Sequence, residues 1–164
     1  MIVSLRTLTY NELKGQLSKD DKIVIWTCNL CIRFCGVGGE TVANDLAAKL
    51  KDDGFNVLHV ETIGYGCHLG LVRNRTREVI TKGIFEQANA FIVLSCTDGF
   101  EKVERVFRKK KVIQASATVG IGAYSSETGM RLVNPFADTG LKASVKGISL
   151  KEAAKKLKMY STPF

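Results

Sequence analysis

The sequence predicts an α/β protein, a three-layer Rossmann- or flavodoxin-like domain with a mostly parallel sheet of four to five strands. Short apolar runs alternate along the chain with helical patterns of ten to fifteen residues, which is typical of βαβ units. The runs are continuously apolar rather than alternating, as in strands that are buried on both faces. A chain of 164 residues is most simply one domain and can bury a core without disulfides.

Within the single domain, 1–164, the sequence indicates three parts. Residues 1–20 are expected to form an N-terminal helical extension, and 20–125 an α/β core that carries all the cysteines. Residues 126–164 are expected to form a C-terminal extension that ends in a Lys-rich helix.

The helices are predicted from caps and from apolar spacing. Thr9 and Glu12 form a capping box for a short helix that ends near Leu17. Three further helices are expected over 40–51, 69–82 and 99–107, the first because Val42, Leu46, Ala47 and Leu50 share one face. For the second, the inner side is predicted to be Leu71, Val72, Val79 and Ile80. A second capping box, Ser149 and Glu152, opens a helix to about Met159.

The strands are predicted from the apolar runs. They are KIVIWT at 22–27, FNVLHVETI at 55–63, AFIVLS at 90–95, and 111–115. Residues 116–147 are rich in Gly and Ser and give no clear pattern.

The charge distribution narrows the choice of partners. The net charge is +8, but the basic residues are scattered apart from 108–111 and 151–158, and neither stretch carries interleaved aromatics. This favours a solvated surface or an acidic protein partner over nucleic acid. No apolar stretch approaches about 18 residues and no signal peptide is evident, so we expect a cytoplasmic location without a membrane partner.

Five cysteines are the main candidates for chemistry. Cys28, Cys31 and Cys35 lie in WTCNLCIRFCGVGG, directly after the first apolar strand, and Cys67 and Cys96 follow the next two strands. The C-terminal ends of parallel strands share one edge, about 4.8 Å apart per neighbour, and ligands bind there. The topology therefore predicts that all five thiols lie in one region.

Clustered thiols in a reducing compartment indicate a metal or cluster site. A zinc site and a [4Fe–4S] cluster both accept four thiolates, and spacing does not separate them. A thioredoxin-like dithiol would leave three cysteines unexplained. A nucleophilic thiolate lacks a clear base, because His59 falls within a strand and His68 is the only other histidine.

A glycine run follows the cysteines. Gly36, Gly38 and Gly39 would let the backbone approach a bound cofactor, and the helix that starts near Gly39 would direct its N–H groups toward an anionic cluster. A nucleotide loop is disfavoured, since GVGG is not G-x-G-x-x-G and no Gly-Lys-Ser/Thr follows.

The stretches TCNLCIRFCGVGGE, LAAKLKDDGFNV, GCHLGLV and AFIVLSCTDGFEKV resemble the cysteine-rich subunit or C-terminal domain of methylenetetrahydrofolate reductases of the acetogen type. The similarity covers about residues 20–125. It implies an iron–sulfur protein that transfers electrons to a flavin-containing partner in one-carbon metabolism. Its cluster ligands would come from Cys28, Cys31, Cys35, Cys67 and Cys96.

One departure from that family shapes the expectation. Its members usually carry a second cysteine-rich segment, whereas residues 116–164 contain no cysteine. We therefore expect one cluster in a non-catalytic subunit of an oxidoreductase rather than an enzyme by itself. The alternative is a zinc-bearing structural or partner-binding module without a redox role.

Overall fold

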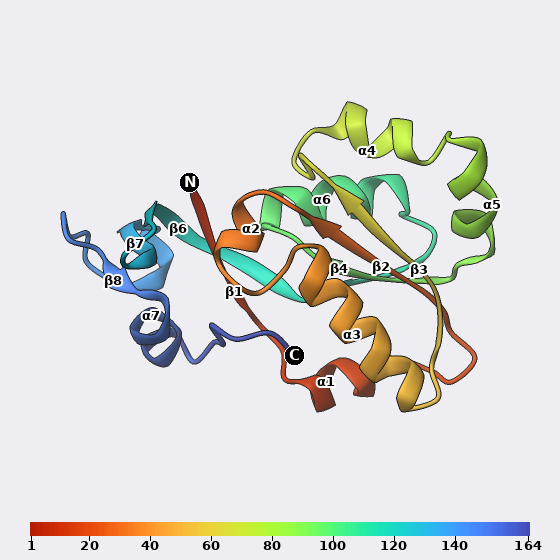
Figure 1. Ribbon diagram of the computed structural model, residues 1–164, viewed down its shortest axis with the longest axis horizontal. Coiled ribbons are helices and arrows are strands. Elements are labelled where there is room, and N and C mark those ends of the chain that lie inside the picture. The colour runs from red at the N-terminus through yellow and green to blue at the C-terminus, as the bar shows by residue number, and fades with distance from the viewer.

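The computed structural model describes residues 1–164 and contains two four-stranded sheets (Figure 1). One sheet has the order β3-β2-β4-β5, and the other has the order β1-β6-β7-β8. The two sheets lie end to end along the long axis of the molecule, with β6 running toward the parallel sheet. The chain is therefore an α/β protein with an additional antiparallel sheet.

The first sheet is entirely parallel, as the apolar runs indicate. Its strands are β2 (Lys22–Cys28), β3 (Asn56–Ile63), β4 (Ala90–Leu94) and β5 (Lys111–Gln114). In register, Cys28 lies opposite Ile63, and Thr27 lies opposite Leu94. The carboxyl ends of β2, β3 and β4 thus share one edge.

Helices cover both faces of this sheet. One face buries Ile23, Ile25 and Ile92 against α1 (Tyr10–Gly15) and α3 (Glu40–Asp52). The other face buries Trp26 and Phe91 against α4 (Leu69–Arg75), α5 (Val79–Gln87) and α6 (Thr97–Val106). Because alternate residues of each strand enter different cores, the strands are apolar along their whole length.

The Thr9–Glu12 capping box is confirmed, whereas of the predicted Ser149–Glu152 box only the serine cap forms. The Glu12 N–H donates to the Thr9 hydroxyl at 3.2 Å, and the Thr9 N–H donates to the Glu12 carboxylate at 2.7 Å. Ser149 caps α7 (Leu150–Leu157) by accepting from the Glu152 N–H at 3.2 Å. These contacts satisfy N–H groups that the first turn of a helix leaves free.

The antiparallel sheet was not expected from the sequence. Its strands are β1 (Ile2–Arg6), β6 (Ser116–Ser125), β7 (Gly129–Pro135) and β8 (Ile148–Ser149). A short 3₁₀ turn, Ala137–Thr139, lies between β7 and β8. A helical description of residues 1–20 is therefore incomplete, because β1 precedes α1 and pairs with β6. Gly122 permits the close approach of β6 and β7, since a β-carbon there would lie 2.1 Å from the carbonyl oxygen of Arg131.

The expected helix over 69–82 is wrong as a single element. It divides into α4 and α5 around Thr76–Glu78, where Arg75 forms an ion pair with Glu78 and the Thr81 hydroxyl donates to the Arg75 carbonyl at 2.9 Å. The break changes the direction of the helix and therefore the side that faces the core. Val72 is buried as predicted, whereas Val79 and Ile80 are 93% and 86% exposed.

The C-terminal segment returns to the first strand. The Arg6 guanidinium lies over the rings of Tyr160 and Phe164, at 4.6 and 4.4 Å from their centroids. Its Nε donates to the Thr162 carbonyl at 2.9 Å, and another nitrogen donates to the Leu8 carbonyl. Arg6 is 94% buried by these partners.

None of the helices is both long enough and apolar enough to cross a membrane.

Candidate functional site

Four of the five cysteines line one cavity of about 410 Å³ at the C-terminal edge of the parallel sheet. Cys28 is the last residue of β2, and Cys31 is the first residue of α2 (Cys31–Phe34). Cys67 lies in the loop after β3, and Cys96 is the N-cap of α6. The topology thus brings together side chains that are up to 68 residues apart, as the alternation of strands and helices predicts.

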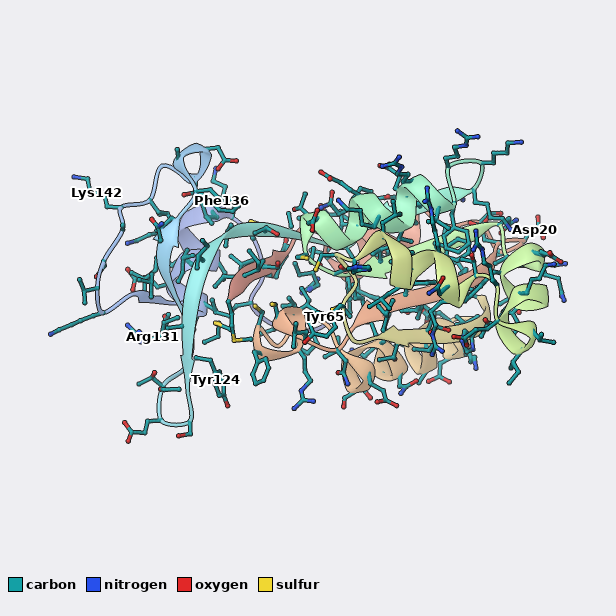
Figure 2. All side chains as sticks on the ribbon, turned by 90° about the horizontal axis from the view of Figure 1, so that it is seen from above. Asp20, Tyr65, Tyr124, Arg131, Phe136 and Lys142 are labelled. Atoms are coloured by element: carbon teal, nitrogen blue, oxygen red, sulfur yellow. The ribbon has the colours of Figure 1, made fainter.

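The remaining walls come from both sheets. Ile2 of β1, Thr118 of β6 and Phe136 after β7 line the cavity on one side. Leu30, Ile32, Tyr65, Thr97, Asp98 and Glu101 complete the lining. Figure 2 shows sulfur atoms gathered where the two sheets meet. The site is therefore a mostly apolar pocket between the sheets, with carboxylates from only one helix.

Backbone N–H groups point at two of the sulfur atoms in the cavity. The Gly66 N–H donates to Cys28 Sγ and the Gly99 N–H donates to Cys96 Sγ, each at 3.4 Å. Such donors stabilise the thiolate form, which is the form that binds metals. The Cys28 thiol also reaches the Gly64 carbonyl at 3.5 Å, so its proton has an acceptor when the thiol is neutral.

Cys35 differs from the other four. It is buried against β1, where its sulfur accepts from the Ser4 N–H at 3.4 Å and its thiol reaches the Ile2 carbonyl at 3.8 Å. Burial raises the pKa of the Cys35 thiol to about 11. It does not line the cavity. Of the five cysteines, Cys35 is therefore the one that is buried as a neutral thiol outside the cavity.

The cavity thiols share one electrostatic environment. Burial raises the pKa of Cys67, and the nearby Asp98 carboxylate adds to the shift. Burial also raises the pKa of Cys96, while the Gly99 N–H and the Ser95 hydroxyl oppose this shift. Repulsion from Cys28 contributes to the raised pKa in both cases. A cation placed among these sulfurs would reverse the effect and favour their thiolates.

The glycines that were expected to approach a cofactor do not line the cavity. Gly36 and Gly39 adopt positive φ of 72° and 89°, which forms the turn between α2 and α3. A β-carbon at Gly38 would lie 2.6 Å from Ile32, and the Gly39 N–H donates to the Thr27 hydroxyl at 2.8 Å. These glycines therefore pack the turn onto the end of the sheet.

Two other glycines contact the cysteine region, and sequence reasoning missed them. A β-carbon at Gly66 would lie 3.2 Å from Cβ of Cys28, and one at Gly99 would lie 1.9 Å from the Ser95 hydroxyl oxygen. The sequence signal is local: Gly66 directly precedes Cys67, and Gly99 follows Cys96 by three residues, where its N–H can reach an N-cap side chain.

Neither histidine lines the cavity. His68 caps α4 by accepting from the Leu71 N–H at 3.3 Å, and His59 contacts Glu61 at 3.1 Å on β3. In the arrangement described, no three His, Cys, Asp or Glu side chains are placed to hold a single metal ion.

A scan against protein-family models and searches of curated proteins and of solved structures found no match to the chain. What the site can do chemically therefore follows from its residues. Four thiols set in an apolar wall offer the ligand types of a multi-metal cluster, and the thiols can also be oxidised.

Proposed function

We propose that this chain is a small iron–sulfur protein whose single [4Fe–4S] cluster is bound by Cys28, Cys31, Cys67 and Cys96. The observation that carries the proposal is that these four thiols, from four separate segments, line the same cavity. Four thiolates are the usual ligand set of such a cluster. Cys35 is left as a packing residue, because it faces β1 instead.

The character of the cavity fits this group. All four donors are free thiols, and no disulfide competes for them. Two of their sulfurs already accept hydrogen bonds from backbone N–H groups, and such hydrogen bonds to sulfur tune the reduction potential of iron–sulfur centres. The apolar residues Ile2, Leu30 and Ile32 would limit the access of water.

The cluster, when bound, would supply one-electron transfer. The chain's own residues would bind it and set its surroundings, with Gly66 and Gly99 donating to sulfur. We propose that the electrons pass to or from a flavin-containing partner of a one-carbon enzyme, as in reductases of the methylenetetrahydrofolate type. The resemblance of residues 20–125 to that family supports this role, in which the chain is a non-catalytic subunit.

The same reasoning extends to the fold and the location. We propose that the parallel sheet with helices on both faces is a three-layer Rossmann- or flavodoxin-like core. In its order β3-β2-β4-β5, the second strand of the sheet along the chain, β3, lies at the edge beside the first, β2, as in such folds. A cytoplasmic, reducing location would keep the five cysteines free, as they are here.

The test is the metal content of the chain purified and reconstituted without oxygen. We expect about four iron and four sulfide ions per chain, with a broad visible absorbance that bleaches on reduction. An electron paramagnetic resonance signal should appear in the reduced protein. One zinc ion per chain, with no iron after reconstitution, would instead favour the zinc-bearing module and overturn the proposal.

A further inference from the structure

The start of α5 carries an exposed apolar surface away from the cavity. Val79 and Ile80 are adjacent and are 93% and 86% exposed, and Leu71 of α4 is 40% exposed. Figure 1 shows α5 at the end of the molecule opposite the antiparallel sheet. Most large aliphatic residues of this chain are buried, so two neighbours that are almost fully exposed call for an explanation.

This surface is held in place by a buried carboxylate. Glu61 on β3 is 2% exposed and accepts from Arg75 Nε at 2.7 Å, while His59 lies 3.1 Å from its other oxygen. Arg75 also pairs with Glu78 at 2.7 Å, directly before Val79. The ion pairs therefore fix the turn between α4 and α5 in the conformation that exposes the two aliphatic side chains.

The surface is also basic. Arg73 and Arg77 are exposed and form no ion pair. The two nearby carboxylates, Glu78 and Glu86, are already paired with Arg75 and Lys82. Arg77 lies two residues before the exposed aliphatic pair and Arg73 lies near the end of α4, so two unpaired guanidinium groups come shortly before this pair in the chain, and both suit an acidic surface.

We infer that Arg73, Arg77, Val79 and Ile80 form a docking surface for an acidic protein partner. Ile80 and Val79 would enter an apolar depression on that partner, and Arg73 and Arg77 would bind its carboxylates. Arginine is enriched among residues that dominate binding energy. This surface is separate from the cysteine cavity, so the inference does not depend on the proposed cluster.

Charge and shape favour this occupant over two others. A second copy of the chain would place Arg73 and Arg77 near another basic surface, because like patches meet in a symmetric dimer. A lipid surface usually takes a continuous apolar face with Trp, Phe or Leu. Here Phe85 of the same helix is buried in the core, so the nearly fully exposed apolar surface of α5 is limited to Val79 and Ile80.

The test begins with a photo-crosslinking residue, Ile80→benzoylphenylalanine, in the full chain produced in its native cells. The crosslinked protein is identified by mass spectrometry and purified, and its affinity for the unmodified chain is measured. We expect an acidic partner whose Kd rises at least tenfold with the double variants V79S/I80S and R73E/R77E. Raising the salt from about 0.1 M to about 0.5 M should also weaken binding.

Matched controls lie on another part of the surface. Val145 is 98% exposed and Lys142 is exposed in the same loop, so V145S and K142E change equivalent side chains without touching α4 or α5. Their Kd should equal that of the parent chain. All variants should keep the thermal unfolding midpoint and the metal content of the parent chain, which separates this inference from the proposed function.

Three results would overturn the inference. The first is the absence of any crosslinked protein, or a partner whose affinity the variants leave unchanged. The second is binding to vesicles of phosphatidylcholine and phosphatidylserine that V79S/I80S abolishes, which would assign the surface to lipid. The third is a dimer of the parent chain that the same variant dissociates, observed by analytical ultracentrifugation.

Discussion

Ser95 fills the space in front of Gly99 so closely that a β-carbon at Gly99 would lie 1.9 Å from the Ser95 hydroxyl oxygen. The same Gly99 donates its N–H to Cys96, so the glycine links the end of β4 to the cysteine cavity. Ser95 is itself almost completely buried and has little room to move away.

Gly99→Ala should therefore destabilise the chain, although alanine is the better helix former. Overpacking of this kind costs about 1–3 kcal/mol of unfolding free energy, measurable by urea denaturation. Gly83→Ala is the matched control, because Gly83 also lies in a helix and its β-carbon would meet nothing within 4 Å. That variant should be stabilised by up to about 1 kcal/mol. Equal effects of the two substitutions would contradict the prediction.

The cysteines should separate into two classes in a series of alanine variants. Cys28→Ala, Cys31→Ala, Cys67→Ala and Cys96→Ala should each lose most of the iron after anaerobic reconstitution, because each removes a thiol from the cavity. Cys35→Ala should keep the iron. It should lose about 1–3 kcal/mol of stability instead, since the buried Ser4 N–H loses its acceptor. A Cys35→Ala variant without iron would place Cys35 among the ligands.

The stability of the metal-free, reduced chain should fall at alkaline pH because of Cys35. Its thiol ionises near its ordinary pKa of 9.0 in the unfolded chain, but only at about 11 in the folded chain. The contribution of Cys35 to the unfolding free energy is complete below the pKa of the unfolded chain. It is lost as pH rises toward the pKa of the folded chain, because the thiol of the unfolded chain releases its proton first. The loss is about 2–3 kcal/mol by this linkage.

Chemical denaturation at several pH values between 8 and 11 measures this loss. Other groups also titrate in that range, so the informative quantity is the difference between the parent chain and Cys35→Ala. The two pH profiles should converge as pH rises. Parallel profiles would show that Cys35 ionises equally easily in both states.

Removing the guanidinium of Arg6 should destabilise the chain and release its C-terminal segment. Arg6→Ala deletes hydrogen bonds to two backbone carbonyls and the stacking on Tyr160 and Phe164. We expect a loss of about 2–3 kcal/mol and faster removal of Phe164 by carboxypeptidase. Arg6→Lys should recover only part of the stability, because an ammonium group lacks the planar fork of donors.

A control for Arg6 is available on α6. Arg105 is exposed and forms no ion pair, so Arg105→Ala should change the stability by less than about 0.5 kcal/mol. If carboxypeptidase removed Phe164 equally fast from the parent chain and from Arg6→Ala, the stacking would have no role in holding the segment.

The parallel sheet was predictable because its strands are buried on both faces and are therefore apolar throughout. The antiparallel sheet was not, because its strands carry mixed residues. β6 contains Gly120 and Gly122, which weaken the strand signal, and both are needed where β7 approaches closely. β1 is only five residues long, and its partner lies more than 100 residues later in the chain. No local pattern indicates such a pairing.

The sequence predicted which edge of the sheet carries the candidate site, but not which cysteines line it. The positions of Cys28, Cys67 and Cys96 follow from the carboxyl ends of three parallel strands. The direction of Cys35 does not, because it depends on β1, which supplies the Ser4 N–H. The break between α4 and α5 was also hidden, because Thr76, Arg77 and Glu78 include neither Gly nor Pro.

The pairing of β1 with β6 has a consequence for the order of assembly during synthesis. Residues 2–6 are translated before the parallel sheet, but their partner strand β6 is translated only after that whole sheet. Until then the edge that carries Cys28, Cys31, Cys67 and Cys96 lacks the wall formed by Ile2, Thr118 and Phe136. The four thiols would thus stay open on that side until the antiparallel sheet forms, which leaves a period during synthesis in which the proposed cluster could enter.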